Sequence, residues 1–187
     1  MNVRAELRLD KDAFFSWLET QDRRHELVNG RPVMLPYVSR NHAYICTNIL
    51  VALHRRMNLA RHAAVQGDFA VDVGPDSVRF ADIMVEKREN DGAARSTQNA
   101  LFLAEVLSPS TMHVDFGDKL GEYLALPSLG TYLICAQDAR RVWVWTRENG
   151  EWPSEPAIVE EAHAEIAIPV LGVTLPMAEI FRGMPFA

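Results

Sequence analysis

The sequence is poor in the residues that mark several common classes of enzyme. Its 187 residues include only two cysteines, Cys46 and Cys135, which lie in different apolar segments and form no closely spaced metal-binding pair. We expect both to be reduced core residues. The six histidines lack HExxH spacing, and no Walker or dinucleotide-binding glycine pattern occurs. The stretch SPST at 108–111 lacks the G-x-S-x-G elbow. These absences argue against zinc proteases, P-loop NTPases, dinucleotide-dependent enzymes and serine hydrolases.

Long apolar runs and an excess of positive charge are also missing. No stretch is long and apolar enough to cross a bilayer, and the charged N-terminal segment lacks the apolar centre of a signal peptide. The 19 basic and 25 acidic residues give a formal net charge of -6. A protein that coats nucleic acid is more often basic, although an enzyme can carry a local basic strip. We therefore expect a cytoplasmic protein that does not bind membranes and is not an architectural DNA binder.

The composition suits a single globular domain spanning residues 1–187, with 48% hydrophobic and 24% charged residues. Asp10 can cap a first helix, and Asn29-Gly30 predicts a type I′ hairpin within HELVNGRPVML. Ser39 or Asn41 can cap a second helix, whose far end is crowded by basic residues as far as His62. The first part of the chain is therefore predicted to form a helix, a hairpin and a longer helix.

The rest of the chain reads mainly as strands. Alternation and a Gly-Pro-Asp turn predict two strands within residues 65–87, and the polar segment that follows is predicted as a loop. A buried strand at 101–107 precedes a helix at 112–125, two further strands, and a tail of one or two strands and a helical turn. The economical interpretation is an α/β fold with a mixed central sheet flanked by helices.

Two acids occupy unexpected positions in apolar strands. Glu105 lies inside the buried strand, where an unpaired charge is costly, and Asp82 opens the apolar run DIMVE on the preceding strand. Consecutive strands usually lie side by side, so the two carboxylates would repel each other unless a cation lies between them. Carboxylates together with the carbonyl of Val106 suit Mg²⁺ or Mn²⁺. The alternatives are that Asp82 only starts a strand and that Glu105 pairs with a buried arginine such as Arg79.

Lys119 and Glu26 are two further candidates for the same pocket. Lys119 follows on the next predicted helix, one helical step from Asp115 and from Tyr123, and its ammonium group could reach a bound phosphate. Glu26 is an acid in the apolar stretch of the first hairpin. The alternatives are that Lys119 and Asp115 form an ordinary surface pair, and that Glu26 caps or pairs across its hairpin.

Four segments in this order resemble the Uma-type restriction endonuclease family of the PD-(D/E)XK nuclease superfamily. They are HELVNGRPVML, VRFADIMV, AEVLSPST and DFGDKLGEYLALPSLGTYLI, and the resemblance extends over nearly the whole chain. It implies a restriction-endonuclease-like fold and metal-dependent hydrolysis of phosphodiester bonds, with DNA as the favoured substrate. Metal-assisted hydrolysis would use the ion to polarise the phosphoryl group and to lower the pKa of a water molecule.

The resemblance also implies roles for single residues. Asp82 matches the acid of the family's Pro-Asp dipeptide, Glu105 matches the acid of its E-x-K half, and Glu26 matches the acid of its Y-E-L-x-x-G stretch. Lys119 matches the lysine on the following helix, because Leu107 stands where E-x-K would place it. The chain departs from the family pattern at three positions, which are Ala81 for proline, His25 for tyrosine and Asn29 for aspartate.

Two questions stay open at the level of the sequence. The chain could be a binding module on a nuclease fold without catalysis, or a purely structural or regulatory α/β protein in which Glu105 pairs with an arginine. A homodimer is also predicted, because two active sites would suit the two strands of a duplex. Trp143 and Trp145 share one face of a strand, which could be an interface or could cover the core.

Overall fold

The helices form where local sequence favours them. The computed structural model of the protein describes residues 7–89, 91–107 and 117–186. The Asp10 side chain accepts a hydrogen bond from the Ala13 amide at the start of the first helix, and the Ser39 hydroxyl does the same for His42, so Ser39 rather than Asn41 caps the second. The helices are α1 (Lys11–Leu18), α2 (Arg40–Arg56), α4 (Asp118–Leu124) and α5 (Met177–Ile180), with a 3₁₀ turn η1 (Pro169–Leu171).

The central layer is a six-stranded sheet of order β11-β10-β9-β8-β6-β3. Strands β8 and β9 are parallel and are joined through α4, whereas the other neighbours are antiparallel, so the sheet is mixed as predicted. Its strands are β3 (His62–Gln66), β6 (Ile83–Lys87), β8 (Ala100–Leu107), β9 (Thr131–Ala136), β10 (Val142–Thr146) and β11 (Ala157–Val159).

A second sheet of five strands was not foreseen from the sequence. It has the order β2-β1-β5-β4-β7 and contains the predicted hairpin, in which Asn29 and Gly30 both have positive φ. A two-stranded sheet, β12 (Glu165–Ile168) and β13 (Val173–Pro176), forms the tail with α5. The strands of the second sheet are β1 (His25–Val28), β2 (Arg31–Met34), β4 (Ala70–Gly74), β5 (Ser77–Arg79) and β7 (Ser96–Thr97).

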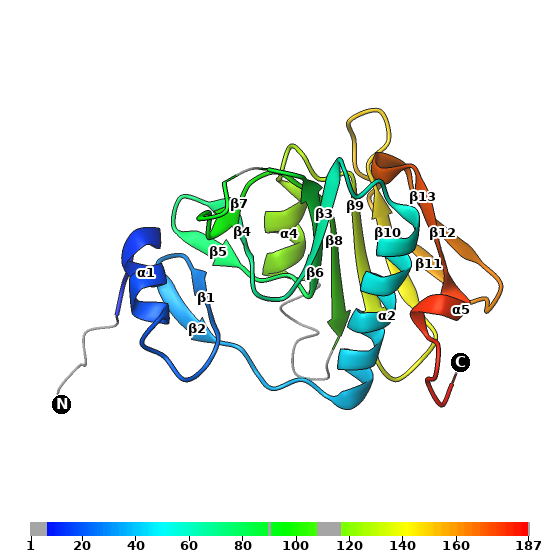
Figure 1. The fold of residues 1–187 in the computed structure, drawn as a ribbon, viewed down its shortest axis with the longest axis horizontal. Helices are drawn as coiled ribbons and strands as arrows, with labels where there is room; N and C mark the ends of the chain where they lie inside the picture. Colours follow the sequence, from blue (N-terminus) through cyan, green and yellow to red (C-terminus); the bar gives the residue numbers. More distant parts are fainter. Residues whose placement is uncertain (1–6, 90, 108–116, 187) are drawn as a thin grey trace.

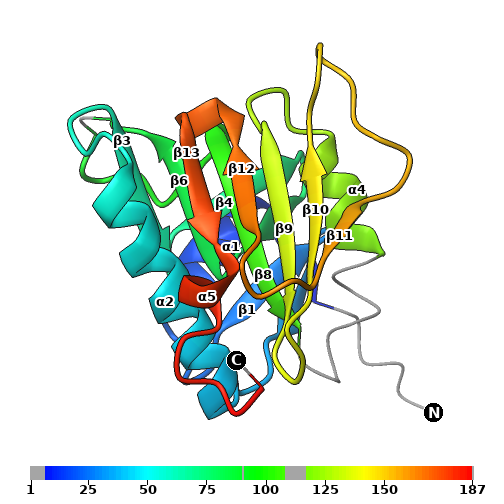
Figure 2. The same ribbon diagram turned by 90° about the vertical axis from the view of Figure 1, so that its right-hand side faces the viewer.

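The two faces of the six-stranded sheet are covered by different helices (Figures 1 and 2). Along β8, Phe102 and Ala104 face the core cluster that holds α2, α5 and β13, whereas Leu103 faces the cluster that holds α4. Helix α4 lies between the six-stranded and the five-stranded sheet, and α1 packs on the outer part of the five-stranded sheet. By alternation, Glu105 lies on the face of β8 that meets α4.

Two predictions about the chain between residues 56 and 87 were wrong in detail. Helix α2 ends at Arg56, and His62 opens strand β3 because the Asn58 carbonyl accepts from the amides of Arg61 and His62 and turns the chain. The segment predicted to hold two strands holds parts of four. Gly67, with φ +65°, separates β3 from β4, and the chain passes from one sheet to the other between β5 and β6.

The tryptophans of β10 cover the core. Trp145 is 3% exposed and stacks on Tyr132 with 5.7 Å between ring centroids, and the half-buried Trp143 packs against the same cluster. Of the two interpretations of Trp143 and Trp145, the structure supports the one in which they cover the core. Both cysteines are free and buried. Across the described ranges, every helix is too short or too polar to be a candidate for crossing a membrane.

Candidate active site

Asp82 and Glu105 meet at the end of strand β8, as the sequence predicted. The antiparallel register of β6 and β8 pairs Ile83 with Ala104. One residue further, Asp82 therefore lies opposite Glu105, on the side of the sheet that faces α4. The Asp82 amide donates a hydrogen bond to Glu105 Oε2 at 3.3 Å, and the Val106 amide donates to Asp82 Oδ2 at 2.8 Å. Each carboxylate therefore reaches across to the backbone of the other's strand, and the two side chains lie close together.

The charge state of Asp82 follows from its neighbours. Burial raises the pKa of Asp82, but the hydrogen bond and charge of His42, the Val106 amide and the charge of Lys119 outweigh burial and hold it below the ordinary value. The side chain keeps 21% of its surface exposed. Asp82 is therefore an ionised carboxylate with an accessible edge at neutral pH.

Lys119 joins two of the predicted acids. Its ammonium nitrogen lies 3.1 Å from Glu105 Oε1 and 3.1 Å from Glu26 Oε1, and all three side chains are buried. Tyr123, one turn further along α4, donates to Glu105 Oε1 at 3.0 Å. Burial and the nearby acids raise the pKa of Tyr123 well above its usual value, so the phenol remains a donor. The surface partner proposed for Lys119, Asp115, lies outside the described residues, as does the SPST turn.

Arg79 has different partners from the one considered in the sequence. Its guanidinium group donates to Glu26 Oε2 at 3.1 Å and to both carboxylate oxygens of Glu122 at 2.6 and 3.1 Å. Burial lowers the pKa of Arg79, but Glu122 and Glu26 outweigh it and raise the pKa above the ordinary value. Glu26 also accepts from the Phe80 amide at 3.0 Å, so it is tied to the site rather than across its own hairpin.

His42 is a site residue that the sequence did not single out. Its Nε2 lies 2.9 Å from Asp82 Oδ2 and its Nδ1 lies 3.5 Å from the Cys46 sulfur. Because an ionised carboxylate only accepts, Nε2 carries the hydrogen and holds Asp82 in place. The only indication in the sequence is spacing, since His42 and Cys46 are one turn apart on the face of α2 that packs on the sheet.

The site opens into a small cavity. Asp82, Glu105 and Lys119 line it together with the backbone of Val106, and its volume is about 60 Å³. The remaining lining comes from His42 on α2, from Arg24 just before β1 and Phe80 just after β5, and from the segment before α2, namely Leu35, Pro36, Tyr37 and Val38. All four predicted catalytic residues are thus in or next to one cavity.

The side chains of this site suit a hard divalent cation. The site holds four acids and two cations, which gives a formal charge of -2 before His42 is counted. The acids are Asp82, Glu105, Glu26 and Glu122, and the cations are Lys119 and Arg79. The acids at the cavity offer oxygen atoms, the ligands that Mg²⁺ and Mn²⁺ prefer.

A mixed set of potential ligand atoms, from His42, Cys46 and Asp82, also lies within 4.8 Å. Burial raises the pKa of Cys46, so its sulfur stays a thiol and is a poor ligand. We therefore regard the three residues as a hydrogen-bonded chain that ends on Asp82.

Comparisons with known proteins agree with this architecture. A crystal structure described as "a putative nuclease belonging to DUF820", from Anabaena variabilis, superposes with a TM-score of 0.71 and 17% identity, covering 92% of this chain and 97% of that one. At 17% identity, this similarity shows that the two proteins share a fold. The "Uncharacterized protein slr1290" of Synechocystis sp. is 23% identical over 184 residues, which is 96% of this chain and 94% of that protein. The model of the family described as "Uma2: Putative restriction endonuclease" matches residues 12–178, so the chain belongs to the Uma2 restriction endonuclease family.

Proposed function

We propose that the protein is a metal-dependent nuclease that hydrolyses phosphodiester bonds in DNA. In this proposal Asp82, Glu105 and the carbonyl of Val106 hold one Mg²⁺ or Mn²⁺ ion. The observation that carries the proposal is the convergence of Asp82, Glu105 and Lys119 on one cavity, with the Lys119 ammonium nitrogen 3.1 Å from both Glu105 and Glu26. The nuclease family to which the chain belongs supports the same reaction.

The chain's own groups have distinct tasks in the proposed reaction. A bound divalent ion supplies Lewis acidity at the phosphoryl group and lowers the pKa of a water molecule. Lys119 donates hydrogen bonds from its ammonium group, either to the attacking water or to the phosphoryl oxygens as negative charge develops there. Hydrolysis joins the water oxygen to phosphorus, breaks one ester P–O bond and leaves a proton on the departing oxygen.

Two residues act on the positions of others. Glu26 accepts from Lys119 and from the Phe80 amide, so it directs the ammonium group toward Glu105. His42 donates to Asp82 and leaves the other carboxylate oxygen for the cavity. These contacts fix side chains that would otherwise sample several rotamers, which is the main requirement for catalysis by preorganised charge.

Cleavage of plasmid DNA tests the proposal. The wild-type protein is expected to nick or linearise plasmid in Mg²⁺ or Mn²⁺ and to do neither in EDTA. Glu105→Gln and Lys119→Ala should each lower the rate by about 100-fold or more, since each removes a charge at the reacting phosphate. Glu86→Gln is the matched control, because Glu86 is also a buried acid of the same sheet but does not line the cavity.

Metal binding provides an independent measurement. Calorimetric titration with Mn²⁺ should show binding to the wild-type protein and to Glu86→Gln, and much weaker binding to Asp82→Asn. Equal affinity of wild type and Asp82→Asn would contradict the ligand set. Nicking that survives in both Glu105→Gln and Lys119→Ala would assign the activity to another site or to a contaminant.

A second function, binding of DNA without cleavage, is favoured by one observation. Lys119 already contacts two of the acids, and the cavity at the site holds only about 60 Å³, below the usual size of a ligand pocket. Binding of labelled DNA without any metal-dependent cleavage would support this function over the nuclease.

A further inference from the structure

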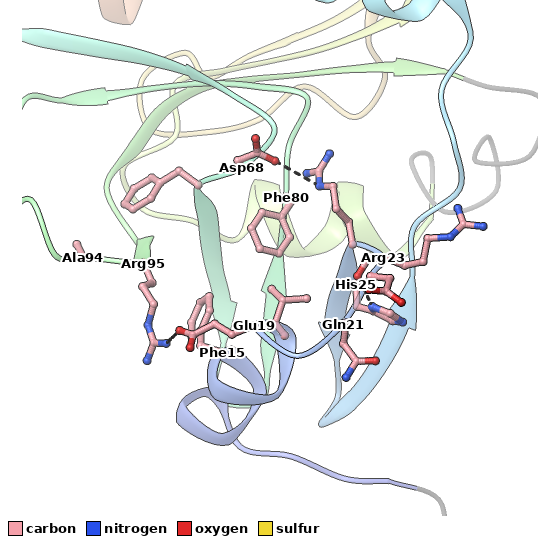
Figure 3. Close-up of a pocket in the computed structure, with 13 residues that line it drawn as sticks. Phe15, Glu19, Gln21, Arg23, His25, Asp68, Phe80, Ala94 and Arg95 are labelled. Carbon is pink, nitrogen blue, oxygen red and sulfur yellow. Dashed lines mark hydrogen bonds and ion pairs between the residues drawn. The ribbon is translucent and has the colours of Figure 1, made fainter.

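A second and larger pocket lies beside the candidate active site. It has a volume of about 440 Å³, within the range typical of small-molecule sites, and is formed by α1, the segment that follows it, and loops of the five-stranded sheet. In Figure 3 the ring of Phe80 lies in the middle of the pocket, with Phe15 below it and Asp68 above it. Phe15 and Phe80 are each 8% exposed, so both rings pack in the core and each presents only a small part of its surface to the pocket.

The pocket combines aromatic rings with guanidinium groups. The Arg24 guanidinium lies 5.6 Å from the ring centre of Phe80, and that of Arg95 lies 4.9 Å from the ring centre of Phe15. The half-buried Phe69 lines the same space. Aromatic rings and guanidinium planes are the surfaces on which unstacked nucleobases pack, and each such contact tolerates any base.

The charges of the pocket argue against a simple phosphate site. Three acids, Glu19, Asp22 and Asp68, line the pocket together with three arginines, so their formal charges cancel. Arg24 lies 3.5 Å from Asp68, and Arg95 lies 3.2 Å from Glu19. A bare phosphate would meet three carboxylates here. A base offers flat faces to the rings and, in cytosine, adenine or guanine, an amino group to the carboxylates.

The pocket adjoins the cavity at the carboxylates. Arg24 and Phe80 line both spaces, and the Phe80 amide donates to Glu26 of the candidate active site. A DNA strand with one phosphate at Asp82 and Glu105 could therefore place the base of a neighbouring nucleotide in the larger pocket, because the two spaces are adjacent.

From these observations we infer that the larger pocket binds one unstacked nucleobase of a DNA strand, next to the phosphodiester at the active site. The inference deepens the proposed function and rests on it for the position of the phosphate. It names the substrate class as single-stranded DNA, or a duplex whose base has turned out of the stack.

Binding of single-stranded DNA with and without bases tests the inference. The probes are two fluorescein-labelled DNA dodecamers, one of deoxycytidine and one of abasic deoxyribose residues. Each is titrated in EDTA and followed by anisotropy. The wild-type protein should bind the base-bearing strand about tenfold more tightly, the scale of one base–aromatic stack. Phe69→Ala should abolish this preference, and Arg24→Gln should reduce it.

Two matched controls separate the pocket from general damage. Phe186→Ala removes a half-buried ring at the opposite end of the molecule, and Arg141→Gln removes a half-exposed arginine that also pairs with an acid and lies near a tryptophan. Both should keep the tenfold preference. Equal affinity of the wild-type protein for the two dodecamers would overturn the inference, as would a preference that persists in Phe69→Ala.

The two proposals fail in different ways. Metal-dependent plasmid cleavage by a protein that does not prefer the base-bearing strand would overturn the base pocket and leave the nuclease intact. A clear preference for bases in a protein that never cleaves DNA would support the pocket and overturn hydrolysis.

Discussion

At the scale of single residues, Arg79 organises the acids of the site. It is 2% exposed and binds Glu26 on strand β1 and Glu122 on helix α4 at the same time. Without a cation here, Glu26 would depend on Lys119 and the Phe80 amide alone, and Glu122 would lose both hydrogen bonds from Arg79. Buried ion pairs contribute little net stability when they replace apolar groups, but removing one partner leaves the other charge unpaired.

Replacing Arg79 should therefore destabilise the protein strongly. We expect Arg79→Met to lower the free energy of unfolding by about 3 kcal/mol, because Glu26 and Glu122 lose a shared cation in a buried site. Urea denaturation followed by circular dichroism measures the change. Arg141→Met is the matched control, since its pair with Glu160 is about half exposed, and it should cost less than about 1 kcal/mol. Equal losses in the two variants would contradict the role given to Arg79.

At the scale of elements, the passage between the two sheets explains where the acids lie. The chain leaves the five-stranded sheet after Arg79 and enters the six-stranded sheet at Ile83. In this passage the Phe80 amide donates to Glu26 and the Asp82 amide donates to Glu105, so side chains replace strand partners there. Buried backbone donors need acceptors, and the acids of the site provide them. These acids therefore have a structural task besides any catalytic one.

The sequence predicted those elements whose determinants are local. Asp10 and Ser39 cap helices through contacts three residues away, and Asn29-Gly30 adopts the positive φ angles that its turn requires. The five-stranded sheet was missed because its pairs join distant segments, such as Leu27 with Val78, and alternation alone does not reveal a partner.

For the candidate site, too, the sequence predicted what local pattern determines and missed what depends on contacts between distant segments. Glu105 and Asp82 were predicted because an acid in an apolar strand is conspicuous, and consecutive strands usually pair. The alternative that Glu105 pairs with Arg79 was wrong, because the partners of Arg79 depend on how β5 lies relative to β1 and α4 in space. His42 was missed because nothing in its neighbours distinguishes it from a core histidine before Asp82 is placed beside it.

Helix α5 is joined to α2 by an ion pair whose strength should depend on pH. Arg56 donates to both oxygens of Glu179 at 3.0 and 2.6 Å, and this hydrogen bonding lowers the pKa of Glu179. A lowered pKa stabilises the fold above about pH 4.3, the pKa of glutamate in an unfolded chain, and the contribution is lost as the pH falls through the lower folded value.

Glu179→Gln is therefore expected to lower the free energy of unfolding by about 0.5–1 kcal/mol at pH 7, the scale of an accessible bidentate pair. The difference from the wild-type protein should shrink as the pH falls below the unfolded pKa of about 4.3, and it should disappear once the pH is below the lowered pKa of Glu179 in the folded protein. Urea denaturation at several pH values measures it. Glu155→Gln, at an exposed acid elsewhere, should show little difference at any pH, and a loss in Glu179→Gln that stays constant throughout the acidic range would contradict the explanation.

At the scale of the whole molecule, the candidate site lies where both sheets meet α4. Glu26 comes from the five-stranded sheet, Glu105 from the six-stranded sheet and Lys119 from the helix between them (Figure 1). No single layer holds the set, so the geometry depends on how the two sheets pack on α4. Core substitutions between the layers would therefore alter the site as well as the stability.

The homodimer stays a prediction, but its support now lies elsewhere. The tryptophans of β10 face the core, whereas the edge strand β2 and the segment between it and α2 carry exposed apolar residues, which are Val33, Met34, Tyr37 and Val38. Tyr37 and Val38 also line the cavity at the carboxylates. Exposed apolar patches often mark interfaces, and an open strand edge can pair with a second chain. A dimer formed through the edge of β2 and the segment before α2 would bring two cavities toward one DNA duplex.

Light scattering after size-exclusion chromatography tests this arrangement. At micromolar concentration the wild-type protein should have twice the chain mass of 21.1 kDa, and Val38→Glu should shift it to the single mass, because a charge would be buried without a partner in the interface. Ile158→Glu changes an exposed residue of the other sheet's edge strand β11 and should leave the dimer intact. A monomeric wild-type protein would contradict the dimer. A dimer broken only by Ile158→Glu would move the interface to β11, away from the carboxylates, and would leave each active site to act on a strand alone.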